Sequence, residues 1–269
     1  MVRLTRALRP EGINWPLDDK GEPSNRLELI TSANGIAHEN AHDALADVTA
    51  LIAVTKLIKQ KQPQLYDYLL KMRDKKVVQQ LVNVDDKKPF VYASGRYDKE
   101  FAKTTVAFPL TTSRNGGVVV YDLRYDPTPF VGLSAEELAK KIFASWEECQ
   151  AEDFTKLPVK ELQHNRCPAV APLGVLEQGD GWQKISLDLA TVQKHQNILL
   201  NYPDFAEKLR TIFENKPAFK KLPDPEAQLY DGFLNDHDRL QVEAVRNADE
   251  RRSEEQSTKI GRASCRERV

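Results

Sequence analysis

The sequence lacks paired cysteines, long apolar runs and an excess of either charge, and each absence excludes a class of protein. Its three cysteines, Cys149, Cys167 and Cys265, lie far apart, which excludes a disulfide framework and a four-cysteine zinc site. No run is long and apolar enough to cross a membrane, and no apolar segment follows the basic start MVRLTRALRP, so we expect no secretory signal. Lys and Arg number 39 against 40 Asp and Glu, so the net charge indicates no polyanionic partner. We expect a cytoplasmic protein.

The remaining composition is typical of a globular chain, with 41% hydrophobic and 29% charged residues. The C-terminal segment is an exception. Residues 259–269, KIGRASCRERV, resemble a translated sequencing-library adapter, and we leave them out of the expected fold. The alternative is a natural basic tail.

Helical periodicity is strongest near the N-terminus. Residues 26–34 fit a short amphipathic helix that ends at Gly35. A longer helix follows, with Asn40 as its expected N-cap and Asp43 in its first turn. Its apolar residues recur every three or four positions, which predicts one buried face. This face consists of Ala41, Ala44, Leu45, Val48, Leu51, Ile52, Thr55 and Ile58.

Strand-like runs begin after Pro63, which ends that helix, and a short helical piece at 64–71. The runs are KPFVYAS, TTVAFPL and GGVVVYDLRY, and the turn residues between them indicate a small β-rich domain. A helix at 133–148 and strands within 158–170 follow. The remaining elements are helical, at 187–213 with an interruption at Pro203 and again from about Asp236.

The segment HENAHDALAD holds the densest group of chemically active residues, and two motifs overlap in it. The first is H-E-x-x-H, formed by His38, Glu39 and His42. On one helix, this motif binds zinc through its histidines while the glutamate activates water for peptide hydrolysis. Because Gly35 lies just before it and strong helical periodicity begins after it, we do not expect His38 in a regular helix. No third zinc ligand is evident.

The second motif is H-x-A-x-x-D, formed by His42, Ala44 and Asp47. Hydrolysis of a phosphodiester by two metal ions requires carboxylates that hold the ions about 3.5 to 4 Å apart. A nearby histidine can act as the base that activates water. Five residues of helix turn through about 500°, so His42 and Asp47 lie on different sides, His42 at the loop-to-helix junction and Asp47 on the helix. The alternative is a histidine that is only solvated or hydrogen-bonded at a helix start.

This second motif and several other segments resemble the exodeoxyribonuclease I family of DEDDh exonucleases. The segments occur in the order RALRPEGINWP, PSNRLELITSANGI, AHDALADV, NRCP and AQLYDGF, between Arg6 and Arg239. The resemblance implies a monomeric enzyme that uses two Mg²⁺ ions and degrades single-stranded DNA from its 3′ end, releasing 5′-mononucleotides in DNA repair and recombination. It implies two partners, single-stranded DNA and the C-terminal tail of single-stranded DNA-binding protein.

The resemblance also implies the fold class, α/β and α+β. Residues 1–62 are the expected C-terminal part of a ribonuclease-H-like exonuclease domain. Residues 63–215 are an SH3-like β domain, and residues 216–258 are a linker and the start of a helical domain. The tail 259–269 follows.

The family's first motif, Asp-x-Glu, and the aspartate of its second motif are expected to precede Met1. Asp224 and Glu226 have the right spacing, but they lie in a Pro-rich linker without an apolar strand. We therefore expect this chain to be a fragment, and to be inactive by itself.

Residue by residue, the resemblance assigns four roles. His42 matches the general base, and Asp47 matches the family's last metal-binding aspartate. Arg26 matches a substrate-contacting arginine, whose guanidinium suits phosphate. Tyr68 resembles the aromatic residue that helps to bind the tail of single-stranded DNA-binding protein. The alternatives are a surface arginine that packs at a helix start and a tyrosine of the core.

A hypothesis of another class is a module that binds single-stranded DNA or a partner without catalysis. Lysines could attract phosphates while aromatic rings stack on bases. The candidates are Lys75, Lys76, Lys87 and Lys88 with Phe90, Tyr92 and Tyr97. The alternative is a solvated lysine face.

Overall fold

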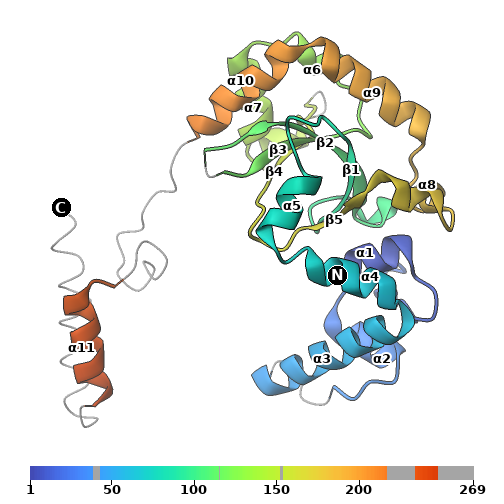
Figure 1. Cartoon of the computed structure of the whole chain (residues 1–269), viewed down its shortest axis with the longest axis vertical. Coiled ribbons are helices and arrows are strands. Elements are labelled where there is room, and N and C mark those ends of the chain that lie inside the picture. Colours follow the sequence, from blue (N-terminus) through green and yellow to red (C-terminus); the bar gives the residue numbers. More distant parts are fainter. Residues whose placement is uncertain (39–42, 115, 152–153, 217–233, 248–269) are drawn as a thin grey trace. The chain divides into compact units, whose positions relative to one another are not determined.

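The protein is described by a computed structural model that covers most of the chain (Figure 1). The described residues are 1–38, 43–114, 116–151, 154–216 and 234–247. They belong to two compact units, Met1–Asn215 and Lys216–Val269. The described part of the second unit holds helix α11 (Asp236–Arg246), whose first turn is capped by the Asn235 side chain. Its start at Asp236 confirms the sequence prediction.

An antiparallel sheet of five strands forms the centre of the first unit, in the order β4-β3-β2-β1-β5. The strands are β1 (Phe90–Ala93), β2 (Thr104–Thr112), β3 (Val118–Asp122), β4 (Val159–Leu162) and β5 (Ala169–Pro172). The three strand-like runs of the sequence become β1, β2 and β3. The register shifts between Pro109 and Thr111 of β2, because proline has no N–H group for the ladder. The expected β-rich domain is confirmed.

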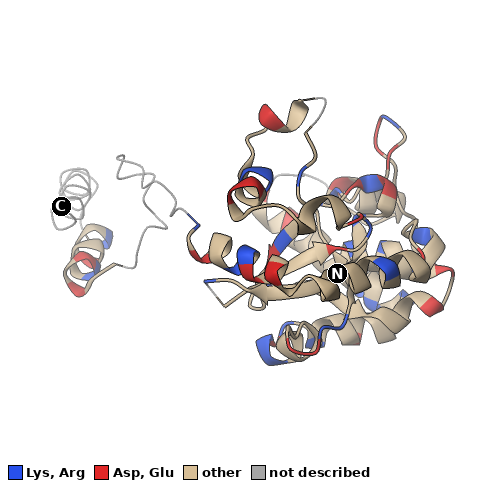
Figure 2. Cartoon of the chain, turned by 90° about the horizontal axis from the view of Figure 1, so that it is seen from above, with Lys and Arg blue, Asp and Glu red and all other residues tan. Residues whose placement is uncertain are grey.

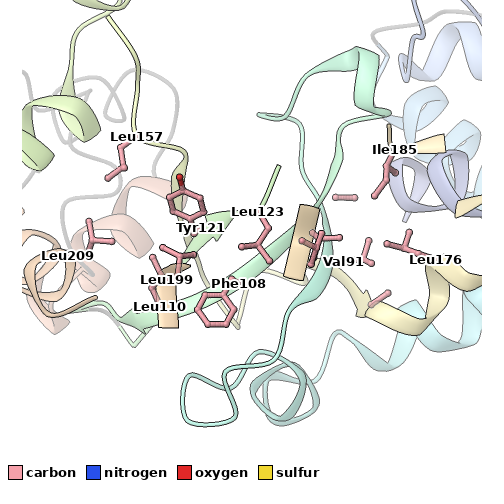
Figure 3. Packing of buried hydrophobic residues seen from close by; sticks show 14 of the residues in the cluster. Val91, Phe108, Leu110, Tyr121, Leu123, Leu157, Leu176, Ile185, Leu199 and Leu209 are labelled. Carbon is pink, nitrogen blue, oxygen red and sulfur yellow. The ribbon is translucent and has the colours of Figure 1, made fainter. Parts of the chain in front are cut away.

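The two faces of the sheet bury different sets of side chains, as strand alternation requires. One face points Val91, Phe108 and Tyr121 into the largest core cluster, part of which is seen in Figure 3. The opposite face points Phe90, Tyr92 and their neighbours into a second cluster. Each strand from β1 to β3 is therefore almost completely buried.

Helices cover both faces, with α9 and α10 on the side of the larger cluster and α5 on the other (Figure 1). Pro203 begins α10, since a proline fits the first turn of a helix. Ser134 and Glu137 form a capping box at the start of α7, which ends earlier than expected, at Phe143. The helices here are α1 (Val2–Leu8), α5 (Lys75–Leu81), α6 (Thr128–Val131), α7 (Ala135–Phe143), α8 (Gly181–Lys184), α9 (Leu189–Asn201) and α10 (Pro203–Glu214). Short 3₁₀ turns lie at Lys99–Phe101, Glu148–Gln150 and Leu173–Glu177.

Three further helices, α2 (Leu27–Ala33), α3 (Ala44–Lys61) and α4 (Pro63–Lys71), lie between α1 and α5 in the chain. Residues of α2 and α3 meet in a small third cluster of buried side chains, Ile13, Ile30, Val54 and Ile58. None of the described helices combines the length and the apolar character needed to cross a bilayer.

The expected buried face of α3 is wrong for most of its residues, although Ile58, one of its members, is buried. The buried residues of this helix are Ala50, Val54 and Ile58, a narrow stripe at a spacing of four. Leu51 is 53% exposed, and Leu45 is 73% exposed. Val48 and Ile52 are also exposed, whereas Ala41 lies outside the described residues. The third cluster is small and covers only this stripe. The apolar side chains of Leu45, Val48, Leu51 and Ile52 are not covered by the described residues.

The expected N-cap of α3 is also different. Asp43 is the N-cap, and its side chain accepts a hydrogen bond of 3.1 Å from the Ala46 N–H. An aspartate at this position satisfies a backbone donor that the helix itself leaves unpaired. Asn40, the cap expected from the sequence, lies outside the described residues.

Candidate functional site

Asp47 lies in the first turn of α3, one turn after the Asp43 cap. Its carboxylate faces the positive end of the helix, where a negative charge is stabilised. About half of the side chain is accessible. Asp47 thus projects from the helix with an oxygen that can bind a hard cation, the position that the H-x-A-x-x-D motif predicts.

His38 contacts this carboxylate, a link that the sequence analysis missed. Its Nε2 donates a hydrogen bond of 2.8 Å to Asp47 Oδ1, and its Nδ1 lies 3.4 Å from Thr31 Oγ1. The His38 side chain is only 5% exposed. The loop before α3 and the end of α2 therefore fix the orientation of Asp47. The only sequence signal was a second histidine close to the aspartate.

The expected base, His42, lies outside the described residues, as does Glu39. His38 itself is not helical, as the sequence analysis expected. Asp224 and Glu226 also lie outside the described part. Within the described ranges, no three His, Cys, Asp or Glu side chains form a group that could hold a metal ion.

Arg26 occupies the N-cap position of α2 and is largely exposed. Its Nε lies 2.7 Å from Glu28 Oε1, in an ion pair whose arginine side chain is 69% accessible. Such exposed pairs contribute little to stability, so the guanidinium can exchange its partner at small cost. Both expected uses of Arg26, phosphate contact and stabilisation of a helix start, fit this position.

Tyr68 is half-buried on α4 and packs against both large core clusters. Its hydroxyl is buried without a hydrogen-bond partner among the described residues. Burial raises the pKa of Tyr68 to about 12. The ring therefore contributes to the core, as the alternative interpretation of this tyrosine expected.

Replacement of Tyr68 by phenylalanine is expected to leave the free energy of unfolding unchanged or to raise it by up to ~1 kcal/mol. The variant removes a buried hydroxyl that has no partner and keeps the ring, so no hydrogen bond is lost. Urea unfolding of the wild type and of Tyr68→Phe measures the difference. A loss of more than ~1 kcal/mol would mean that the hydroxyl has a partner in solution.

Two of the three rings expected to form a stacking surface near β1 are not accessible, and the third, Tyr97, is half-buried. Phe90 is fully buried and Tyr92 is 7% exposed, because successive residues of β1 are covered on both faces of the sheet. These rings cannot stack on bases. The lysines proposed beside them, Lys75, Lys76, Lys87 and Lys88, are exposed. Basic and acidic positions are interspersed over the ribbon of the first unit (Figure 2).

Comparison with known proteins was made by family, by sequence and by structure. The domain family described as "Exonuclease I SH3-like domain" matches residues 73–215. Exodeoxyribonuclease I of Escherichia coli K12 is 37% identical over 247 residues, which are 91% of this chain and 51% of the relative. The Haemophilus influenzae protein of the same name is 36% identical over 250 residues, 92% of this chain and 52% of the relative. The chain spans about half the length of these curated relatives.

Solved structures match the same share of the chain. E. coli Exonuclease I in complex with a dA16 oligonucleotide has a TM-score of 0.81 at 36% identity, covering 92% of this chain and 53% of that one. The zinc-ion-bound E. coli ExoI–ssDNA complex has a TM-score of 0.79 at 35% identity, covering 92% and 52%. A structure titled SSB/Exonuclease I in complex with inhibitor CFAM has a TM-score of 0.75 at 34% identity, covering 92% and 51%.

Proposed function

The chain belongs to the exodeoxyribonuclease I family, and from this premise we propose that it is part of a 3′-5′ exonuclease of single-stranded DNA. The proposed reaction is two-metal hydrolysis of the terminal phosphodiester, with release of 5′-mononucleotides. The observation that carries the proposal is the match over 91% of the chain to the E. coli enzyme. The solved structure of that enzyme with an oligonucleotide supports single-stranded DNA as the ligand.

In this proposal, each site residue has a separate task. His42 takes the proton of the attacking water, and Asp47 supplies a metal-binding carboxylate. Arg26 contacts a phosphate of the strand, for which its exposed guanidinium is available. His38 keeps the Asp47 carboxylate in one orientation through its hydrogen bond of 2.8 Å.

The magnesium ions of the proposal fit the described residues only in part. Asp47 offers the oxygen ligand that Mg²⁺ prefers. A two-ion site needs several carboxylates, and the described residues bring no group of three side chains together for this purpose. The described part of the chain does not by itself make such a site, and no reaction step is derived through the metal.

We predict that the purified chain digests single-stranded DNA at a negligible rate, because Asp47 is the one described carboxylate assigned to a metal and a single carboxylate cannot position two ions. An end-labelled oligonucleotide incubated with the chain and Mg²⁺ measures this by gel electrophoresis. His42→Ala and Asp47→Asn are the matched variants. Clear digestion that both substitutions abolish would contradict the prediction, since it would show a complete catalytic site. Digestion that neither substitution changes indicates a contaminating nuclease.

The second candidate function is binding of single-stranded DNA or a partner without catalysis. The match of residues 73–215 to an SH3-like domain favours it, since the described residues of this range form a five-stranded sheet. Fluorescence anisotropy with a labelled oligonucleotide at low and moderate salt tests this candidate. Binding that weakens as salt rises supports it, because counterions are released from phosphates. Absence of binding at low salt rejects it.

We also propose that the C-terminal tail of single-stranded DNA-binding protein is a partner and that it contacts the surface around Tyr68. The structure titled SSB/Exonuclease I supports the choice of partner. The accessible part of the half-buried Tyr68 ring provides an apolar contact beside the core. The Tyr68→Phe variant keeps this ring, so its affinity for a tail peptide should equal that of the wild type.

A further inference from the structure

The amine of Lys160, on β4, lies over two aromatic rings at the turn that follows β1. Its Nζ is 4.7 Å from the centre of the Tyr92 ring and 5.1 Å from that of Tyr97. The two rings pack edge to face, with centroids 5.5 Å apart. The amine also donates a hydrogen bond to Ser94 Oγ. These contacts hold the amine in one place and remove part of the water around it.

The charges that act on this amine are positive. They belong to Arg96 and Arg3, and no carboxylate forms an ion pair with Lys160 among the described residues. A Cβ atom added at Gly95 would lie 3.0 Å from Arg3 Nη2, so the Arg3 guanidinium lies against the turn. Neither guanidinium has an ion-pair or hydrogen-bond partner within the described ranges. Three basic side chains therefore gather at this turn without an anion.

The loss of water and the two guanidinium charges both favour a neutral amine. Together they lower the pKa of Lys160 from 10.5 to about 8. At about pH 7.5, about a quarter of the side chain is then unprotonated, against about one part in a thousand for an ordinary lysine. An unprotonated lysine amine is a nucleophile, and burial beside other cations is a way in which proteins activate one.

A structural role accounts for only part of this arrangement. Packing of the lysine stem and cation–π attraction explain why the amine lies over the rings. They do not explain the two guanidinium groups beside it, since like charges disfavour the protonated lysine. An anion formed at Nζ would remove this repulsion and accept hydrogen bonds from both guanidinium groups.

We propose that Lys160 is a site of carbamate formation by carbon dioxide. The lone pair of the neutral Nζ attacks the carbon of CO₂ and forms an N–C bond, while one C=O π pair moves to oxygen. The nitrogen then loses a proton to water, so the amine and CO₂ give a carbamate anion and one proton. The step needs no oxidant or further reactant, and neither DNA nor a metal ion takes part.

Carbon dioxide suits this position better than a larger electrophile. Lys160 is half-buried, and its amine lies against two rings, so little room is left beside it. An acyl group would neutralise the amine and leave both guanidinium groups without an anion. A carbamate instead places a negative charge shared by two oxygens beside Arg3 and Arg96, and the fork of an arginine matches such a group.

The test is covalent trapping of the carbamate on the full chain. The protein is equilibrated at about pH 7.5 with isotope-labelled bicarbonate and dissolved CO₂. A trialkyloxonium salt then converts carbamates into stable esters, which are located by digestion and mass spectrometry. The labelled ester is expected on Lys160. In carbon NMR of the untrapped mixture, one carbamate resonance should disappear in Lys160→Arg, because a guanidinium does not lose its proton.

Lys141 is the matched control within the same digest. Its amine also lies over two rings, 5.9 Å from the centre of Phe130 and 5.3 Å from that of Phe154. Unlike Lys160, it lies near a carboxylate, since its charge acts on Glu137 of the same helix. A negative charge beside an amine favours the protonated, unreactive form. Lys141 should therefore carry little labelled ester. Equal labelling of Lys141 and Lys160 would overturn the site.

Arg96→Gln tests the part played by the guanidinium groups. Arg96 is exposed, so the variant leaves the core intact. It removes one positive charge beside the amine and one donor to the carbamate. The yield of ester on Lys160 should therefore fall about tenfold, as for loss of a charge-assisted hydrogen bond. Arg73→Gln removes an exposed arginine whose charge does not act on Lys160, and its yield should equal that of the wild type. An unchanged yield in Arg96→Gln would overturn the proposed site.

The pH dependence separates Lys160 from an ordinary amine. Near pH 7.5 its labelling should exceed that of other lysines about a hundredfold, and near pH 9.5 only about tenfold, following the neutral fractions. Burial raises the pKa of both Tyr92 and Tyr97, and the two arginines stay charged, so no other group at this amine titrates between these values. A ratio that is the same at both pH values would contradict the proposal.

Unfolding provides the last comparison. In urea the rings and guanidinium groups no longer surround the amine, so Lys160 should be labelled no more than any other lysine. Labelling of Lys160 that is selective in the folded wild type and lost in urea supports the site. Absence of the ester from Lys160 in the folded wild type overturns it, whatever the variants show.

Discussion

Replacement of Phe205 by alanine is expected to lower the free energy of unfolding by about 3 to 5 kcal/mol, the range for truncation of a buried aromatic side chain. Phe205 lies on α10, is fully buried and packs edge to face against Tyr121 of β3, with ring centroids 6.3 Å apart. It therefore joins the helical layer to the sheet, and alanine leaves a cavity between them. Urea unfolding followed by circular dichroism measures the loss.

Two control variants test whether the loss of unfolding free energy comes from the cavity left by Phe205. Phe205→Leu fills most of the same space and should cost much less, because the cost grows with the volume of the cavity. Phe143→Ala removes an equal ring from the same layer, where Phe143 pairs with Phe213 at 6.2 Å but is 43% exposed. It should cost less than half as much as Phe205→Ala. Equal losses for the two alanine variants would show that α10 is not packed against the sheet as described.

The sequence was sufficient to predict the sheet because its strands are marked by patterns that depend on local physics. The run KPFVYAS is rich in β-branched and aromatic residues and lies between turn residues, and it became β1. The same pattern could not say that both faces are covered. Phe90 and Tyr92 were therefore assigned to a stacking surface, whereas α5 and the second cluster bury them. Burial depends on what packs from elsewhere in the chain.

In the candidate site too, local features were predicted and contacts that depend on the packing of other segments were not. A motif predicted Asp47 on the first turn of α3, since capping and helix geometry act over a few residues. The contact from His38 depends on how the preceding loop folds back, which periodicity does not specify. The apolar pattern of α3 likewise identified a helix but not the stripe that the described residues bury, because Leu45 and Leu51 are as apolar as Val54.

Stability between pH 4 and 8 should reveal a buried carboxyl group, Asp122 at the end of β3. Its side chain accepts hydrogen bonds from the Thr105 hydroxyl and from the Arg124 N–H, the latter at 3.1 Å. Desolvation raises the pKa of Asp122 to about 6 against an ordinary value of 3.8, and these donors and the Arg124 charge only partly oppose it. The folded protein therefore binds this proton more tightly than the unfolded chain does.

The sign of the effect follows from this difference. The stabilising contribution of the protonated carboxyl is fully present below about pH 4 and is lost as the pH rises through about 6. A shift of about two units corresponds to about 3 kcal/mol of unfolding free energy. In Asp122→Asn the amide oxygen can accept the same two hydrogen bonds and does not titrate, so this loss is absent. The variant should gain about 2 to 3 kcal/mol relative to the wild type between pH 4 and 8.

Urea unfolding of both proteins across this range gives the difference directly, since titration of other groups cancels in the comparison. Asp126→Asn is the matched control because Asp126 is exposed, and hydrogen bonds from Thr128 lower its pKa. Asp126 therefore titrates below about pH 4, and the difference between Asp126→Asn and the wild type should stay nearly constant from pH 4 to 8. If the profiles of Asp122→Asn and the wild type run parallel from pH 4 to 8, the carboxyl titrates as an ordinary aspartate. In that case the Asp122 carboxyl at the end of β3 is accessible to water in solution and is not buried as described.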